Sequence, residues 1–196
     1  AGVSGMNAAA ISLGMQAEVL LLDRNIDKLR EADRIYQGHL QTIASNAYEV
    51  ERAVLDADLV IGAVLVPGAK APTLISNELV SRMRPGSVLV DVAIDQGGCF
   101  EDSRPTTHAE PTFRVHNSVF YCVANMPGAV PHTSTYALTN VTLPYALSLA
   151  NSGWREALRA DPALALGLNT HDGAITNGPV AQAHGLEHRE LADVLG

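Results

Sequence analysis

Residues 1–23, AGVSGMNAAAISLGMQAEVLLLD, are the stretch of the chain that decides the fold. A glycine-containing turn leads into an alanine-rich segment without proline, which favours a helix, and the apolar run after it predicts a buried strand that ends at Asp23. Gly2 and Gly5 have the spacing of the second and third glycines of the G-x-G-x-x-G dinucleotide fingerprint, whose first glycine is not in the sequence. Asp23 follows at close to the offset of roughly 20 residues at which an acid binds the adenosine ribose.

Each of these features has a simpler alternative. Gly2 and Gly5 also fit an ordinary turn before a helix, and Asp23 fits a helix cap or a surface acid. Together they favour a nucleotide site, in which the backbone of Val3 and Ser4 forms the phosphate-binding turn. A carboxylate at position 23 repels the 2′-phosphate of NADP, so the expected cofactor is NAD.

The remainder of the first half alternates between helices and strands. Buried strands are predicted over 58–64 and 87–93, with a weaker one over 39–45. Predicted helices begin after caps at Asn25 or Asp27, at Asn46 and at Ser76. Strands and helices that alternate at this spacing predict an α/β fold with a Rossmann-type doubly wound parallel sheet.

After residue 97 the pattern changes to a loop rich in Thr, Pro and Gly, followed by a last strand near 119–123. A long helix is expected over 131–150, with Thr133 or Ser134 as its cap and a bend at Pro144. We place the domain boundary at residue 131. Residues 1–131 then form the nucleotide-binding domain, and 132–196 form a helical C-terminal segment of a second domain.

Composition narrows the possible functions. The 196 residues include 13 Lys and Arg against 21 Asp and Glu, a formal charge of −8, which argues against a nucleic-acid partner because phosphates need a basic surface. The longest apolar run, 58–69, is too short to cross a membrane. Two cysteines and seven histidines show no metal-ligand spacing, so no metal site is expected, and the low cysteine count suggests a reducing cytoplasmic setting.

Five separated blocks of the sequence are more specific than this general pattern. They read VLVPGAKAP (64–72), VDVAIDQGGCFE (90–101), SRPTT (103–107), YCVANMP (121–127) and TSTYALTN (133–140). In this order they closely resemble the alanine dehydrogenases of the alanine dehydrogenase and pyridine nucleotide transhydrogenase family, in one register from residue 1 to at least residue 154.

The resemblance implies an NAD-dependent enzyme that interconverts L-alanine with pyruvate and ammonia. It implies a subunit in which a nucleotide domain is inserted into a substrate domain, and a homo-oligomer, a hexamer. On that template the sequence lacks the amino-terminal part of the family, the first strand of the nucleotide fold, and the substrate-binding Arg, Lys and His. The 196 residues by themselves are therefore expected to be inactive.

The resemblance also assigns site residues. Asp95 corresponds to the catalytic aspartate, which handles the proton of the water that attacks the imine carbon. The residues expected to contact NAD are Gly2, Val3, Ser4, Gly5, Asp23, Lys28, Ser45, Val64, Leu65, Val92, Ala93, Ile94, Asp95, Arg104, Val123, Ala124, Asn125 and Met126. A positioning role for Lys70 is as plausible as that of a solvated lysine.

Two other functions stay open at this point. One is the nucleotide-binding portion of a proton-translocating transhydrogenase, which resembles this sequence through the Pro-Gly-Ala-Lys region. Transhydrogenases are expected to have a neutral residue at the position of Asp95, because hydride transfer between two nucleotides needs no water-activating acid. The other is an NAD-binding module without chemistry of its own.

Overall fold

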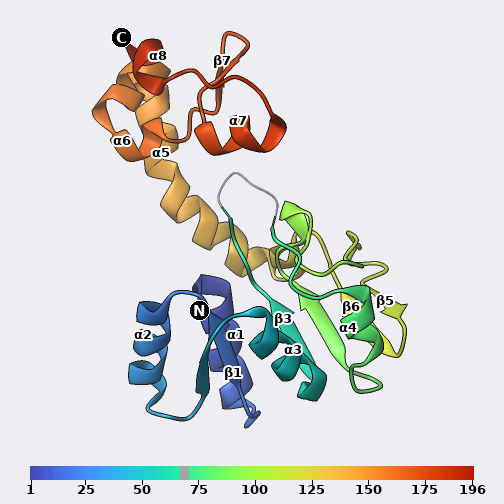
Figure 1. Ribbon diagram of the computed structural model, residues 1–196. Helices are drawn as coiled ribbons and strands as arrows, with labels where there is room; N and C mark the ends of the chain where they lie inside the picture. The colour runs from blue at the N-terminus through green and yellow to red at the C-terminus, as the bar shows by residue number, and fades with distance from the viewer. Residues whose placement is uncertain (67–70) are drawn as a thin grey trace. The chain divides into compact units, whose positions relative to one another are not determined.

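The computed structural model of the chain describes residues 1–66 and 71–196 (Figure 1). Packing divides the chain into two compact units. The first consists of Ala1–Leu65 and Ala71–Met126, and the second is built mainly on 127–196. The predicted motif VLVPGAKAP is therefore described only in part, and Lys70 lies outside the described residues.

The first unit alternates helices and strands along the chain, as the sequence predicts. Its elements are α1 (Val3–Gly14), β1 (Leu20–Asp23), α2 (Ile26–Tyr36), β2 (Gln41–Ala44), α3 (Ala47–Asp56), β3 (Leu59–Gly62), α4 (Asn77–Ser81), β4 (Val88–Asp91), β5 (Thr112–Val115) and β6 (Ser118–Tyr121). A 3₁₀ turn, Ile94–Gln96, follows β4, and another, Met126–Ala129, leads into the second unit.

The strands of this unit form two sheets. β1 pairs with β2 in parallel, in the register Leu20 with Gln41. The larger sheet has the order β3-β4-β6-β5, in which β3, β4 and β6 are parallel and β5 is antiparallel to β6. The expected α/β fold with parallel strands is confirmed, but in the described residues of this unit the strands form two separate sheets and not one continuous sheet.

Local capping explains where three of the helices begin. The side chain of Asn25 accepts the N–H groups of Asp27 and Lys28, Asn46 accepts that of Glu49, and Ser76 accepts that of Leu79. These polar side chains satisfy N–H groups that have no partner within the helix. The sequence prediction is confirmed at Asn46 and Ser76, and it is resolved in favour of Asn25 at the start of α2.

Two hydrophobic clusters hold the first unit together. One packs α1 and α2 on the smaller sheet and includes Ala9, Leu21, Leu29, Ala32 and Leu40. The other surrounds the larger sheet, where Leu89 of β4 and Phe120 of β6 are fully buried. A Cβ at Gly5, in the first turn of α1, would make an ordinary contact of 3.9 Å with the Cβ of Ala63, which places the start of α1 beside the chain just after β3.

Two strand predictions need correction. The strand expected over 87–93 ends at Asp91, because the chain turns there into the 3₁₀ segment. The segment 112–115, which we predicted as loop, forms β5. Its pairing with β6 is a tertiary contact, so the local sequence does not reveal it.

The second unit begins with α5 (Pro131–Ala160). The cap position is Val130 and not Thr133 or Ser134, and the Ser134 hydroxyl instead donates to the carbonyls of Pro127 and Val130. The helix continues through Pro144, whereas Gly153 has a left-handed φ of 75° that interrupts it. The expected bend therefore occurs at a glycine, which tolerates that conformation without a steric penalty.

Short elements complete the second unit. They are α6 (Pro162–Ala165), β7 (Thr170–His171), β8 (Ala174–Ile175), α7 (Gly178–His184) and α8 (Leu191–Leu195). The Trp154 ring packs against that of His171, with centroids 5.0 Å apart and the two planes tilted by 42°. None of the helices in 1–66 and 71–196 is long and apolar enough to span a bilayer.

Candidate functional site

Many of the predicted site residues lie at the carboxyl ends of the parallel strands of the first unit. Asp23 ends β1, and Ser45 follows β2. In the larger sheet Val64 and Leu65 follow β3, residues 92–95 follow β4, and residues 123–126 follow β6. Because β3, β4 and β6 are parallel neighbours, the segments that follow them emerge at one edge of that sheet, where open α/β folds bind ligands.

The amino terminus of α1 supplies backbone donors. Gly2 is the N-cap, with extended backbone angles and no side-chain cap, and its carbonyl accepts the Met6 N–H at 2.9 Å. The N–H groups of Val3, Ser4 and Gly5 lie in the first turn, where the helix provides no acceptor. The Val3 side chain is 84 % exposed, so this turn is open to a ligand. These features fit a phosphate group at the helix end.

Asp23 is tied into the turn after β1. Its carboxylate accepts the backbone N–H of Asn25 at 2.8 Å. Partial burial raises the pKa of Asp23, whereas the hydrogen bond from the Asn25 N–H and the positive charge of Lys28 lower it. The carboxylate is therefore ionised at neutral pH.

An open cavity of about 250 Å³ lies next to this turn. It is lined by Ala1, Met6, Asn25, Asp27, Lys28 and Glu31. The predicted adenosine-side residue Lys28 is thus part of its wall. The Ser45 N–H donates to the Asp23 carbonyl at 2.9 Å, which holds the ends of β1 and β2 together. The structure brings Asp23 and Ser45 together, with Lys28 at the adjoining cavity.

The segment after β4 shows which side chains are available to a ligand. Asp95 and Val92 are exposed, whereas Ala93 and Ile94 are buried. Leu65, after β3, is 70 % exposed. Ala93 and Ile94 were predicted to line the cofactor site. Because their side chains are packed in the core, only their backbone atoms are available to contact a cofactor.

Asp91, at the end of β4, was not among the predicted site residues. It is fully buried and accepts hydrogen bonds from the loop that carries Asp95. The sequence gives one signal for it: Asp91 is an acid within an otherwise apolar strand pattern, and a buried acid needs hydrogen-bond partners.

Arg104 and the segment after β6 form the other side of this edge. The Arg104 guanidinium lies over the Phe113 ring of β5, 4.2 Å from its centroid. The strand-like contact of Thr106 with Val123 places the chain after Arg104 beside the end of β6. Val123 is fully buried. Asn125 has a left-handed φ of 56°, and its carbonyl contacts His108 Nε2 at 3.0 Å.

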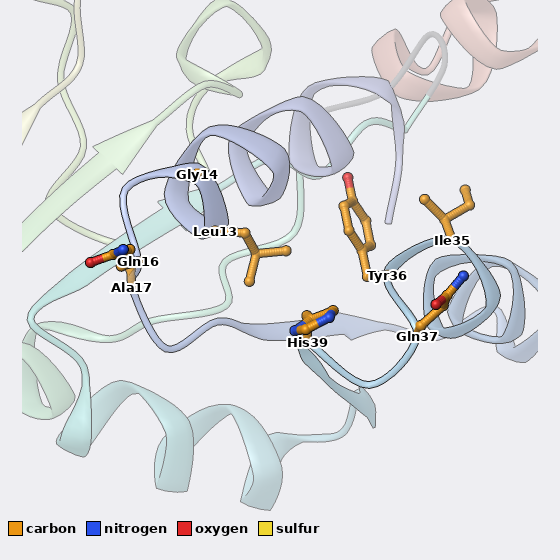
Figure 2. A pocket seen from close by; sticks show the side chains of 8 residues that line it. All are labelled: Leu13, Gly14, Gln16, Ala17, Ile35, Tyr36, Gln37 and His39. Carbon is orange, nitrogen blue, oxygen red and sulfur yellow. The ribbon is translucent and has the colours of Figure 1, made fainter.

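A larger open cavity, about 640 Å³, lies elsewhere in the first unit. Figure 2 shows Leu13 of α1 and Tyr36 of α2 projecting into the same space. Ala17 and His39, which also line it, precede β1 and β2, so this cavity is at the amino ends of those strands. It contains none of the predicted site residues. In the described part of the chain no group of three or more His, Cys, Asp or Glu side chains could hold a metal ion.

Sequence comparison with known proteins finds one family and several of its members. The family model "Alanine dehydrogenase/PNT, C-terminal domain" matches residues 1–178. An alanine dehydrogenase of Mycobacterium tuberculosis is 63 % identical over 195 residues, covering 100 % of this chain and 53 % of that protein. One from Mycolicibacterium smegmatis is 58 % identical with the same coverage.

Solved structures of similar proteins also superpose on this chain. An L-alanine dehydrogenase structure superposes with a TM-score of 0.82 at 48 % identity, covering 94 % of this chain and 51 % of that one. A transhydrogenase from Sinorhizobium meliloti superposes with a TM-score of 0.66 at 26 % identity, covering 91 % and 48 %. The chain spans about half the length of the curated relatives it matches. On the extent of the family match, this chain belongs to the alanine dehydrogenase/PNT C-terminal domain family.

Proposed function

We propose that the chain is the NAD-binding part, with an adjoining C-terminal segment, of an NAD-dependent alanine dehydrogenase that interconverts L-alanine with pyruvate and ammonia. The observation that carries the proposal is the exposed carboxylate of Asp95, on the turn directly after β4. Relatives named alanine dehydrogenase, at 63 % and 58 % identity, support it over the transhydrogenase alternative, whose structural relative is 26 % identical.

The residues present fit a dinucleotide. The first turn of α1 offers backbone N–H groups to a pyrophosphate, and Asp23 offers an ionised carboxylate to the ribose hydroxyls. Lys28 and Met6 line the cavity beside that carboxylate, where an adenosine would be placed. When bound, NAD supplies the hydride acceptor of the reaction.

Asp95 supplies the acid–base chemistry. Removal of a hydride and a proton from alanine leaves an iminium carbon, which water must attack before ammonia can leave. A carboxylate near that carbon orients the water and accepts its proton, and the same group returns a proton to the departing nitrogen. Asp95 is exposed, and within 1–66 and 71–196 its carboxylate takes part in no hydrogen bond, so its oxygens are available to the described part of the site.

The two compact units support an assignment of the chain to two domains. We assign the first unit and the chain to residue 131 to the nucleotide-binding domain, and 132–196 to the C-terminal part of a substrate domain. The packing boundary falls after Met126. We further propose that the protein is a cytoplasmic homo-oligomer, a hexamer. Sedimentation velocity of the complete protein tests this, and a monomer would contradict it.

An assay of the complete polypeptide that carries this sequence tests the proposed reaction. We expect NADH formation that depends on L-alanine, and its reversal by pyruvate with ammonium. Hydride transfer from NADH to an oxidised nucleotide analogue, without any alanine-dependent activity, would instead support a transhydrogenase function. Nucleotide binding with neither reaction would support a module without chemistry.

A further inference from the structure

Asp91 is a buried carboxylate with an unusual set of partners. It ends β4 at 0 % exposure. Its partners are backbone N–H groups, a hydroxyl and a thiol; its described hydrogen bonds include none from a Lys or Arg. An isolated buried carboxylate is costly, so this one requires the donors around it.

All of these donors come from one loop, which follows β4. The Ala93 N–H donates to Asp91 Oδ1 at 3.0 Å, and the Cys99 N–H donates to Oδ2 at 2.8 Å. The Ser103 hydroxyl donates to Oδ2, and the Cys99 thiol lies 3.4 Å from Oδ1. Both carboxylate oxygens are thus used to hold the first part of the loop, at Ala93, Cys99 and Ser103.

The loop backbone is shaped to fit around this carboxylate. Gly98 has a left-handed φ of +77°, and a Cβ there would lie 2.9 Å from Asp91 Oδ2 and 2.6 Å from the Cβ of Ser103. The Gly98 N–H also donates to the Ala93 carbonyl at 3.1 Å. Only glycine allows the chain to reverse this close to the carboxylate.

Asp95 lies between the first and second of these attachments. Its side chain is exposed, and none of the hydrogen bonds in the described ranges involves it. The position of Asp95 is therefore set by the backbone of its loop. That backbone is fixed through Asp91 at Ala93 on one side and at Cys99 on the other, and the Gln96 carbonyl between them accepts the Ala71 N–H at 3.0 Å.

We propose that Asp91 is a positioning residue, which holds the loop in the geometry that presents the Asp95 carboxylate to substrate. This inference rests on the proposed function of Asp95. Asp91 itself is fully buried and therefore inaccessible to a substrate, so it would act through Asp95. The neighbouring thiol fits this arrangement, because burial and the negative charge of Asp91 raise the pKa of Cys99 and keep the thiol protonated as a donor.

The test uses Asp91→Asn in the complete protein. The amide keeps the size of the side chain but replaces one acceptor oxygen with an NH₂ group that faces donors. We expect kcat for alanine oxidation to fall about 10–100-fold, as for other residues that orient a reacting group, with NADH affinity close to that of the wild type. In an Asp95→Asn background the same change should have little further effect on kcat, because the two residues act as a unit.

Ser87→Ala is the matched control. Ser87 is buried just before the other end of β4, where its hydroxyl lies 2.8 Å from that of Ser118. Loss of this buried pair should lower stability without lowering kcat. If Asp91→Asn does not fold, Ser103→Ala removes one donor of the same network, and its smaller loss of kcat should likewise disappear in the Asp95→Asn background.

Amide hydrogen exchange gives a readout that does not depend on activity. Residues 92–103 should exchange faster in Asp91→Asn, while exchange in α2 stays unchanged. Unchanged exchange in the loop, or a kcat equal to that of the wild type in both Asp91→Asn and Ser103→Ala, would overturn the inference. A wild-type protein without alanine-dependent activity would contradict the proposed function instead, and the exchange result would still show whether Asp91 fixes the loop.

Discussion

The Asp91 carboxylate accepts the backbone N–H of Cys99 at 2.8 Å, so the loop after β4 is closed back onto the strand from which it starts. Asp95 lies inside this closed loop, at the edge of the sheet where β3, β4 and β6 end. The acid that we assign to catalysis is exposed, and the acid that holds it in place is buried.

The glycines of the chain allow a matched test of this loop. Gly98 and Gly86 both have left-handed φ values, +77° and +88°, but only Gly98 has atoms within 4 Å of a Cβ. Gly86→Ala should cost about 1–2 kcal/mol of unfolding free energy from backbone strain alone. Gly98→Ala should cost at least about 1 kcal/mol more, from the clash with Asp91 and Ser103, and it should also lower turnover. Urea unfolding and kcat measure both; equal losses for the two variants would contradict this account.

Asp23 should control the choice of nucleotide. Asp23→Ala removes the carboxylate at the end of β1, so we expect weaker NAD binding and a smaller preference for NAD over NADP. Asp33→Ala, which removes an exposed acid of α2, is the control and should change neither. Dissociation constants for the two nucleotides, measured by titration, check the prediction. An unchanged preference in Asp23→Ala would show that the ribose site lies elsewhere.

The two buried thiols predict a pH dependence of stability. Burial raises the pKa of Cys99, aided by the charge and hydrogen bond of Asp91, and burial also raises the pKa of Cys122. Above an ordinary thiol pKa of about 9.0 the unfolded chain loses these protons while the folded chain keeps them. The unfolding free energy should therefore fall as pH rises through that value, by up to about 1.4 kcal/mol per pH unit for each thiol.

A variant with Cys99→Ala and Cys122→Ala isolates this effect from the titration of other groups. Urea unfolding at about pH 8 and about pH 10 should show a smaller loss of stability in the variant than in the wild type. Equal losses would mean that the thiols ionise as readily in the folded protein as in the unfolded one.

The 196 residues on their own should be weakly stable and inactive. β1 and β3 each pair on one side only within the described ranges, and Leu20 and Leu59 on these strands are 37 % and 49 % exposed. Unpaired strand edges with apolar side chains promote association between chains. Thermal unfolding and light scattering test the first expectation, and alanine-dependent activity of the purified 196-residue chain would contradict the second.

Local signals made several features predictable from the sequence. Asn46 and Ser76 cap helices through bonds to N–H groups three residues away, so the sequence alone suffices to place those starts. The strands at β1, β3 and β4 follow from short runs of Leu, Val and Ile that are typical of buried parallel strands. Part of the candidate site follows in turn, because β3 and β4 are parallel neighbours and the segments after them emerge at one edge of the larger sheet.

What the sequence did not reveal depends on contacts between distant residues. β5 exists because Phe113 pairs across from Phe120, and the two rings pack 5.3 Å apart. The end of β4 at Asp91 depends on donors up to twelve residues further along the chain. Residue propensity likewise favoured a bend at Pro144, whereas the helix is interrupted at Gly153.

The central claim is that Asp95 is the acid–base group of an alanine dehydrogenase, and the rate of alanine-dependent NADH formation by Asp95→Asn tests it most directly. In the complete protein this variant should bind NADH nearly as well as the wild type, because the amide preserves the shape of the exposed side chain. Its turnover should fall about 10²–10⁴-fold, as expected for loss of a general acid–base. Turnover equal to that of the wild type would contradict the claim.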